Sequence, residues 1–267
     1  MALTPEHERI AREAFAHADA LTGEVERAFP RAWELMDHMR TNPPMQWPDW
    51  CLLPMGAADV VTGRNPAGAK SHTIAQVSAL YNWRFARSVW IFEPALMSRF
   101  LTQVPDTITL DDLTTLPEWC VFIAGSHPEY PGSGLWAHLE YDTNTGRPEL
   151  RLLLDLGETP LPIPVYLDRG SVTEALADYR ATVQASIGRT GANVHGGSLD
   201  ASVARLAKGI DAYLGILAYL ARPEADIVHA SRGGARPVKP RRPKRDRDIW
   251  LVGYTGTATN AYCATSA

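Results

Sequence analysis

The sequence contains few cysteines and no long apolar run. Its three cysteines, Cys51, Cys120 and Cys263, lie far apart, without a CxxC pair or a Cys/His cluster at zinc-finger spacing. This pattern excludes a disulfide framework and the common zinc modules. No stretch of about 18 apolar residues is present, so the sequence predicts no membrane-spanning helix. The opening "MALTPEHERIAREAF" carries acids where a secretory signal has a basic region, and we therefore expect a cytoplasmic protein with reduced thiols.

Common catalytic and nucleotide-binding motifs are missing as well. The chain has no Walker loop, no GxGxxG and no HExxH, and its eight histidines are scattered, so the sequence predicts no metal and no cofactor. Cys120 is a conceivable nucleophile with His127 or His138 as its base. It stands at the start of an apolar run, however, and unpaired cysteine is among the most buried residue types. We interpret Cys120 as a core residue and predict a non-catalytic protein.

One pair of residues leaves an enzymatic alternative open. Arg189 and His195, in "RTGANVH", resemble the Arg-and-His pairing of some metal-independent ribonucleases. Such a pair has to be aimed at one phosphate by a rigid scaffold, whereas the neighbouring Gly188 and Gly191 predict a loop. The ribonuclease alternative therefore has little support from the residues.

The formal net charge of −4 conceals an uneven distribution. Residues 231–248, which we call the basic segment, contain eight Lys or Arg and two Asp, a net of +6, so the remaining 18 basic and 28 acidic residues give −10. Prolines keep this segment extended, and its cations suit phosphate. The alternative interpretation is a solvated loop that offsets the acidic body. The predicted nucleic-acid-binding residues are Arg236, Lys239, Arg241, Arg242, Lys244 and Arg245.

Hydrophobic periodicity predicts an α+β protein in which helices pack on a small, mainly antiparallel sheet, with a helical N-terminal region. Thr4 and Pro5 are typical of a helix start, and residues 72–92 have a broad apolar side that predicts another helix. "LWAHLEYD" and "ELRLLLDLG" predict a hairpin around "TNTG". "PLPIPVYLD" is predicted to be an edge strand because of its prolines. "ADIVHA" and "DIWLVGYTG" are predicted to be further strands.

The chain is expected to pack as one domain built from four regions. Further helices are predicted after the capping box of Ser171 and Glu174, and between residues 199 and 220. The four expected regions are a mainly helical part (1–110), a sheet-plus-helices core (111–230), the basic segment (231–248), and a final strand and tail (249–267).

Four sequence blocks occur in an order that is typical of one family. They are "LPEWCVFI", "GLWAHLEYD", "SVTEALADY" and "DIWLVGYTG", and a helix ending in "ALYNWRFARSVWIFE" precedes them. Together, from roughly Ile74 to Gly256, they resemble the type V-A anti-CRISPR family that blocks biogenesis of the effector nuclease. Relatives of this family are common on plasmids and other mobile elements. The block around Trp119 and Cys120 is the most specific part of the resemblance.

The resemblance implies a binding protein that acts during translation. Family members are understood to recognise the N-terminal peptide of the effector as it leaves the ribosome, after which the transcript is lost. The implied partner is a nascent N-terminal peptide, of a type V-A effector or of another host protein, with ribosome or mRNA contact through the basic segment and no membrane. Two alternatives stay open: an RNA-binding protein or ribonuclease, and a plasmid-maintenance protein of the same fold with another protein target.

An extended peptide is expected to add to a free edge of the sheet and to place alternate side chains in pockets. "PIPVYLD" and the final "IWLVGY" strand are the expected borders of that groove. We therefore expect aromatic side chains near the sheet to contact the peptide. The predicted peptide-binding residues are Trp83, Trp136, Tyr166, Trp250 and Tyr254.

Overall fold

The computed structural model describes residues 2–63, 71–102, 111–125, 134–155, 160–169, 174–175, 177–178, 181, 210, 212–231 and 236–255. The labelled helices are α1 (Pro5–Ala28), α2 (Ala32–Thr41), α3 (Met55–Thr62), α4 (Ser71–Ala86), α5 (Pro94–Thr102) and the 3₁₀ helix η1 (Asp111–Thr115). The strands are β1 (Ser88–Phe92), β2 (Cys120–Ala124), β3 (Gly134–Asp142), β4 (Arg147–Asp155), β5 (Leu161–Tyr166), β6 (Ile227–His229) and β7 (Asp248–Val252).

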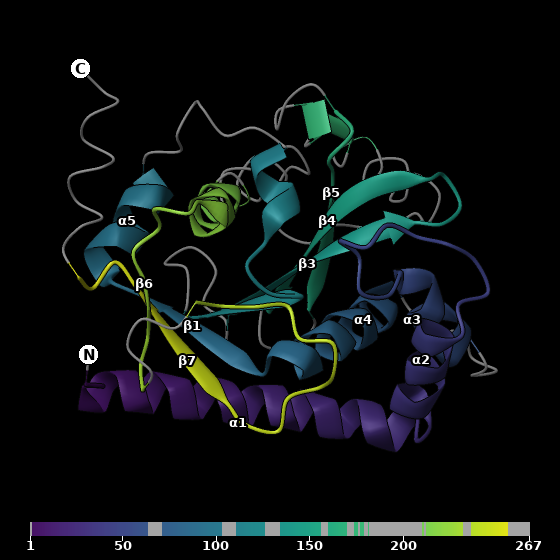
Figure 1. Ribbon diagram of the computed structural model, residues 1–267, viewed down its shortest axis with the longest axis horizontal. Helices are drawn as coiled ribbons and strands as arrows, with labels where there is room; N and C mark the ends of the chain where they lie inside the picture. Colours follow the sequence, from purple (N-terminus) through teal and green to yellow (C-terminus); the bar gives the residue numbers. More distant parts are fainter. Residues whose placement is uncertain are drawn as a thin grey trace, which may run out of the picture.

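In the described part of the chain, seven strands form a mixed sheet in the order β5-β4-β3-β2-β1-β7-β6 (Figure 1). β1 runs parallel to β2 and to β7, and the other neighbouring pairs are antiparallel. The predicted α+β class with a mainly antiparallel sheet is therefore confirmed. β5 lies at one edge of the sheet, as its prolines predict, and β6 lies at the other.

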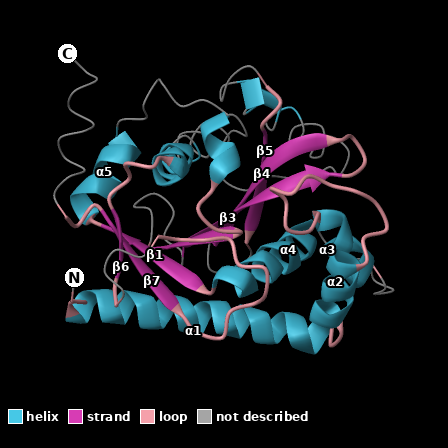
Figure 2. Ribbon diagram, in the orientation of Figure 1, coloured by secondary structure: helices cyan, strands magenta, loops and turns pink. Residues whose placement is uncertain are grey.

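Helices cover both faces of the sheet (Figure 2). One face, with Leu135 and Leu152, belongs to a core that includes side chains of α5 and of the helical segment 212–221. The opposite face, with Trp136 and Leu153, packs against α1 and α4. Alternate residues of β3 and β4 therefore enter two different cores, because successive side chains of a strand point to opposite faces.

Local sequence signals correctly place the start of α1 and the β3–β4 hairpin. The Thr4 side chain accepts a hydrogen bond from the backbone N–H of His7 at 3.2 Å, and Pro5 occupies the first turn. The hairpin pairs Asp142 with Arg147. Gly146 in its turn has a φ of 74°, a conformation that residues with a side chain rarely adopt.

The predicted helix at residues 72–92 is wrong in its second part. α4 ends at Ala86, Arg87 takes a φ of 45°, and β1 follows at once. All five residues of β1 are buried between β2 and β7, and Trp90 lies beside Trp250 in the register. Its sequence, "SVWIF", is rich in β-branched and aromatic side chains, which favour a strand once neighbours are available for pairing.

Several sequence predictions fall outside the described residues. Most of the expected helix after Ser171 lies there, and so does the first part of the one expected at 199–220, whose residues 212–220 are helical. Arg189 and His195 are also outside the described part of the chain. No described helix combines the length and the hydropathy that crossing a bilayer requires.

Candidate peptide-binding and nucleic-acid-binding sites

Three of the five predicted peptide-binding residues are buried in the sheet's cores. Trp83, Trp136 and Trp250 are 1%, 0% and 2% exposed. The Trp83 indole donates to the backbone oxygen of Ser88 at 2.8 Å, and the Trp136 ring stacks on Phe122 with centroids 4.0 Å apart. A side chain without accessible surface cannot contact a peptide in this conformation, so these three tryptophans act as core residues here.

The two predicted tyrosines are half-buried and lie in different places. Tyr166 ends β5, with the Arg147 guanidinium 3.8 Å above its ring. Tyr254 follows β7, donates to the backbone oxygen of Phe92 at 3.1 Å and packs edge-on against His7. Because β5 is one edge of the sheet and β7 is next to the other, the structure does not bring the predicted aromatic residues together into one groove.

The two expected borders for an added peptide strand differ from the prediction. β7 is an interior strand between β1 and β6, so its backbone is already paired on both sides. β5 is an edge, but Pro162 and Pro164 lack an N–H, and a strand proline is tolerated where that missing donor faces away from the sheet. The free side of β5 therefore offers few donors and is a poor template for another strand.

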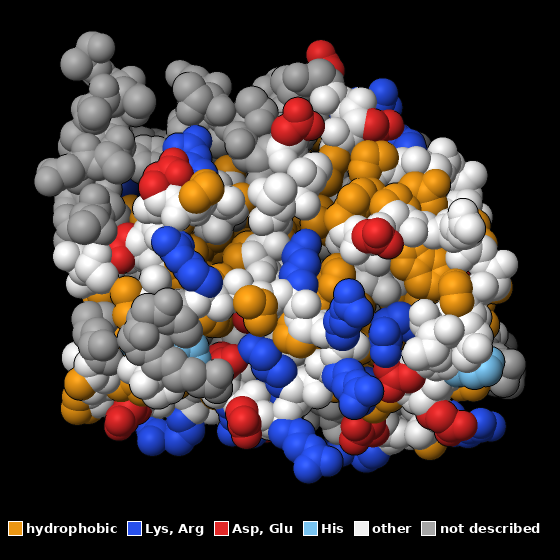
Figure 3. Space-filling view, in the orientation of Figure 1, with side chains coloured by type: hydrophobic (Ala, Val, Ile, Leu, Met, Phe, Trp, Pro, Cys, Tyr) orange, Lys and Arg blue, Asp and Glu red, His pale blue; other side chains and the backbone are white. Residues whose placement is uncertain are grey.

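An apolar groove that the sequence did not reveal lies between α2, the loop that follows it, and α3. It has a volume of about 180 Å³. Met45 and Val60 are 44% and 55% exposed and belong to its wall, and Figure 3 shows apolar side chains gathered on this part of the surface. The signal in the sequence was the loop "PPMQWPDW", with large apolar residues between prolines. The lining includes Met39, Pro44, Met45, Trp47, Val60 and Thr143.

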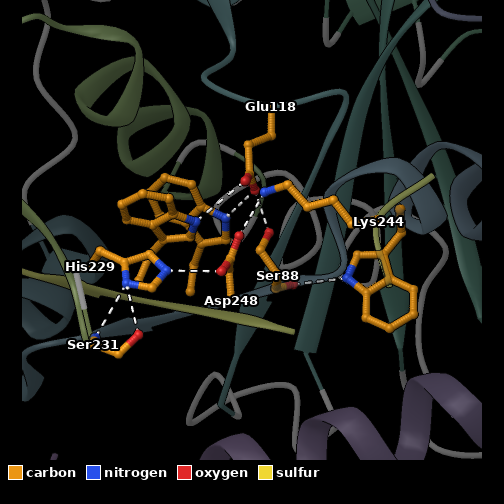
Figure 4. Close-up of polar contacts among 9 residues, drawn as sticks. Ser88, Glu118, His229, Ser231, Lys244 and Asp248 are labelled. Atoms are coloured by element: carbon orange, nitrogen blue, oxygen red, sulfur yellow. Dashed lines mark hydrogen bonds and ion pairs between the residues drawn. The ribbon is translucent and has the colours of Figure 1, made fainter. Parts of the chain in front are cut away.

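A cluster of buried polar residues lies beneath the basic segment (Figure 4). The Glu118 carboxylate has no exposed surface and accepts hydrogen bonds from Ser88 Oγ, from Trp90 Nε1 at 3.0 Å and from Trp250 Nε1 at 3.3 Å. Burial raises its pKa to about 7, although the hydrogen bonds and the charge of Lys244 oppose this shift. These three donors are neutral groups, and their hydrogen bonds offset only part of the cost of ionising a buried carboxyl group.

Asp248, at the start of β7, belongs to the same cluster and contacts Lys244 and His229. It accepts from Lys244 Nζ at 2.6 Å and lies 2.9 Å from His229 Nε2. Burial opposes its ionisation, but the hydrogen bonds from Lys244 and His229 leave its pKa below the ordinary value. The backbone N–H of Ser231 donates to His229 Nδ1 at 3.2 Å. Since a backbone N–H can only donate, Nδ1 is an acceptor and the imidazole proton is on Nε2, facing Asp248.

The structure separates the six predicted nucleic-acid-binding residues into two groups. Lys239 and Lys244 face the body of the protein: the Lys239 ammonium lies 5.1 Å from the ring centroid of Trp119, and Lys244 pairs with Asp248. Burial lowers the pKa of Lys239. The other four are exposed: Arg236, Arg241, Arg242 and Arg245.

The two described cysteines are buried thiols. Cys51 and Cys120 are 2% and 0% exposed, and burial raises the pKa of both, which disfavours the reactive thiolate. His138, which lies opposite Cys120 on β3, contacts Glu140 at 2.8 Å through Nε2. The geometry supports the structural interpretation of Cys120. Among the described residues, no group of three or more His, Cys, Asp or Glu is placed to hold a metal ion.

Comparison with known proteins identifies the family. The AcrVA2-like family model, described as the anti-CRISPR type V subtype A2 family, matches residues 90–264, more than half of the chain. The chain belongs to this family. The resemblance to type V-A anti-CRISPR proteins inferred from the sequence blocks is thereby confirmed.

The AcrVA2-like fold extends over nearly the whole chain. A solved structure titled "Crystal structure of AcrVA2" is similar with a TM-score of 0.64, covering 94% of this chain and 88% of that chain at 17% sequence identity. At this identity the match shows a shared fold. No curated protein matches the chain significantly. The Glu118 cluster and the basic segment of this AcrVA2-like protein lie mostly inside the range matched by the family model, whereas the groove is built mostly from residues before it.

Proposed function

We propose that this AcrVA2-like protein lowers production of a type V-A effector nuclease by recognising the effector's N-terminal peptide during translation. The family match over residues 90–264 carries the proposal. The groove between α2 and α3 supports it, because a nascent segment is unfolded and its apolar side chains are still available for binding. The protein acts by binding and performs no chemistry on the finished nuclease.

Side-chain capture in the groove is favoured over strand addition. The β5 edge lacks N–H groups at Pro162 and Pro164, and β6 is only three residues long. Met39 and Met45 in the groove have flexible, polarisable side chains that adapt to ligands of different shape. Apolar side chains of the peptide therefore supply most of the affinity, and main-chain pairing supplies little.

Aspartate in place of Met45 or Val60 tests the groove. Wild-type full-length protein is expected to bind effector N-terminal peptides on an array. Met45→Asp and Val60→Asp are expected to weaken binding about tenfold or more, because the new carboxylate loses water when apolar peptide side chains cover it. Val238→Asp is the matched control, since Val238 is 57% exposed but lies in the basic segment. Groove variants that bind as tightly as the control would contradict this location of the site.

Coexpression in cells tests the function itself. The chain is expected to lower both protein and transcript of a type V-A effector, and to leave unchanged a version of the effector with an altered N-terminus. Val60→Asp should lose this activity, whereas Ala16→Asp, which adds a carboxylate at an exposed position of α1, should act like wild type. An array without any bound effector peptide, together with unchanged effector levels in cells, would contradict the proposed function.

A further inference from the structure

Four arginines of the basic segment point into solvent without a partner. Arg236, Arg241, Arg242 and Arg245 are exposed, and within the described residues none of their side chains takes part in a hydrogen bond or an ion pair. Residues 236–247 carry seven Lys or Arg and one Asp, a net of +6. Figure 3 shows basic side chains gathered on the face that this part of the segment crosses.

The segment that carries these arginines is fixed to the body at several points. The Trp119 indole donates to the backbone oxygen of Pro240 at 2.7 Å. The backbone N–H of Lys244 donates to the backbone oxygen of Arg84 at 3.2 Å, and the Arg87 guanidinium donates to that of Arg245 at 3.2 Å. Such anchoring orders the backbone before a ligand arrives, so less conformational entropy is lost on binding. We call residues 236–247 the basic ridge.

Two further cations of the ridge are used to fix it in place. Lys244 forms its ion pair with Asp248 beside the buried Glu118 cluster. Arg247 pairs with Asp19 of α1 and lies over the Phe15 ring at 5.0 Å. Lys239 on Trp119 and Lys244 face the body of the protein, and Arg247, although exposed, is held by its ion pair with Asp19. The cations that anchor the ridge and the four exposed arginines, whose side chains have no hydrogen bond or ion pair within the described residues, are therefore different residues of one short segment.

The chemistry of the exposed side favours a polyanion over a folded protein. Protein interfaces need an apolar centre, whereas nucleic-acid interfaces are polar and strongly positive. The ridge exposes one large apolar side chain, Val238, next to four arginines. A guanidinium donates paired hydrogen bonds that match phosphate geometry. A flexible single strand can follow the four arginines along the ridge, since its backbone adapts to their spacing.

We propose that Arg236, Arg241, Arg242 and Arg245 bind the phosphodiester backbone of a single-stranded nucleic acid, and that Lys239, Lys244 and Arg247 hold the ridge in position. This assignment goes beyond peptide recognition and does not depend on it, because the groove and the ridge consist of different residues.

Anisotropy titrations of purified full-length protein with fluorescein-labelled single strands of mixed-sequence RNA and of DNA test the proposal. The ridge variant replaces the four exposed arginines with Gln. The expected affinity loss is about tenfold or more, and the slope of log affinity against log salt should fall by roughly 3, since each single-strand phosphate contact contributes about 0.7. The matched control makes the same charge change elsewhere: Arg9, Arg12, Arg27 and Arg31, all exposed, replaced with Gln.

Each outcome decides for or against the ridge. A loss confined to the ridge variant, with an unchanged melting temperature, supports the proposal, and equal loss with RNA and DNA assigns recognition to phosphate. A loss confined to RNA supports it too and adds contact with the 2′-hydroxyl. Equal weakening by the control variant would overturn the proposal in favour of a general charge effect. No wild-type binding to either strand, or tighter binding of labelled polyglutamate through the same four arginines, would also overturn it.

Discussion

The tryptophans of the sheet and the arginines of the basic ridge both suggest recognition in the sequence, and the structure uses them in opposite ways. Trp136 and Trp250 are sealed between the sheet and its helices. Arg241 and Arg245 stand in solvent on a backbone fixed from beneath. The difference shows that an aromatic ring inside a strand stabilises the fold by burial, whereas the arginines that stay accessible are carried by a surface segment that the body of the protein holds in place.

The largest expected effect on stability comes from removing a fully buried aromatic ring. Trp136→Ala should lower the free energy of unfolding by about 3–5 kcal/mol, because it deletes a fully buried ring that stacks on Phe122. Urea denaturation measures this loss. The fraction that stays folded should bind peptide normally, since the ring has no contact with the surface.

The reverse pattern is expected for a tryptophan of the groove. Trp47 is only half-buried and lines the groove, so Trp47→Ala should cost about 1 kcal/mol of stability and weaken peptide binding. If Trp136→Ala impaired peptide binding more than stability, the division between sealed core and recognising surface would be wrong.

The next effect concerns the buried carboxylates under the ridge and on β4. Burial raises the pKa of Glu118 from 4.5 to about 7. Between these values the folded protein keeps a proton that the unfolded chain has released, so stability falls as pH rises through this window, by roughly 3 kcal/mol. Burial raises the pKa of Glu149 to about 7 as well, and its contribution has the same sign.

Urea midpoints from about pH 5 to pH 8 check this prediction. Glu118→Gln should remove about half of the decline, and the double variant with Glu149→Gln most of it. The lowered pKa of Asp248 does not interfere, because its stabilising effect is lost only when pH falls below the ordinary range of an aspartate. Wild-type stability that is constant across the window would contradict the buried, protonated state of Glu118.

Features with a local cause could be predicted from the sequence. The Thr4 cap, the Gly146 turn and the edge position of the proline-bearing β5 each follow from a few neighbouring residues. The prediction of one helix over residues 72–92 was partly wrong because the apolar residues near its end fit a strand as well as a helix. Ser88–Phe92 becomes a strand only because it pairs with β7, which lies far away in the chain.

The candidate sites could not be predicted from the sequence either, because their residues are far apart in the chain and meet only in the folded protein. The groove combines α2, its loop, α3 and Thr143 of the β3–β4 turn, which no short pattern joins. Composition identified the basic segment, but it could not separate Lys244 from Arg245. That distinction depends on Asp248 and Glu118, toward which the Lys244 side chain points in Figure 4, with its ammonium 2.6 Å from Asp248 Oδ2.

The two neighbouring cations Lys244 and Arg245 give the sharpest comparison, although the expected effects are small. Lys244→Met should cost about 1–2 kcal/mol, because the Asp248 carboxylate loses its ion pair with Lys244 in a mostly buried site. Arg245→Met removes the same charge one residue away, from an exposed side chain, and should change stability by less than about 0.5 kcal/mol. Removing the Lys244 charge also takes away an interaction that lowers the pKa of Glu118, so the decline in stability should extend to higher pH in Lys244→Met. Equal stability losses in the two variants, or an unchanged pH profile in Lys244→Met, would show that Lys244 does not anchor the ridge.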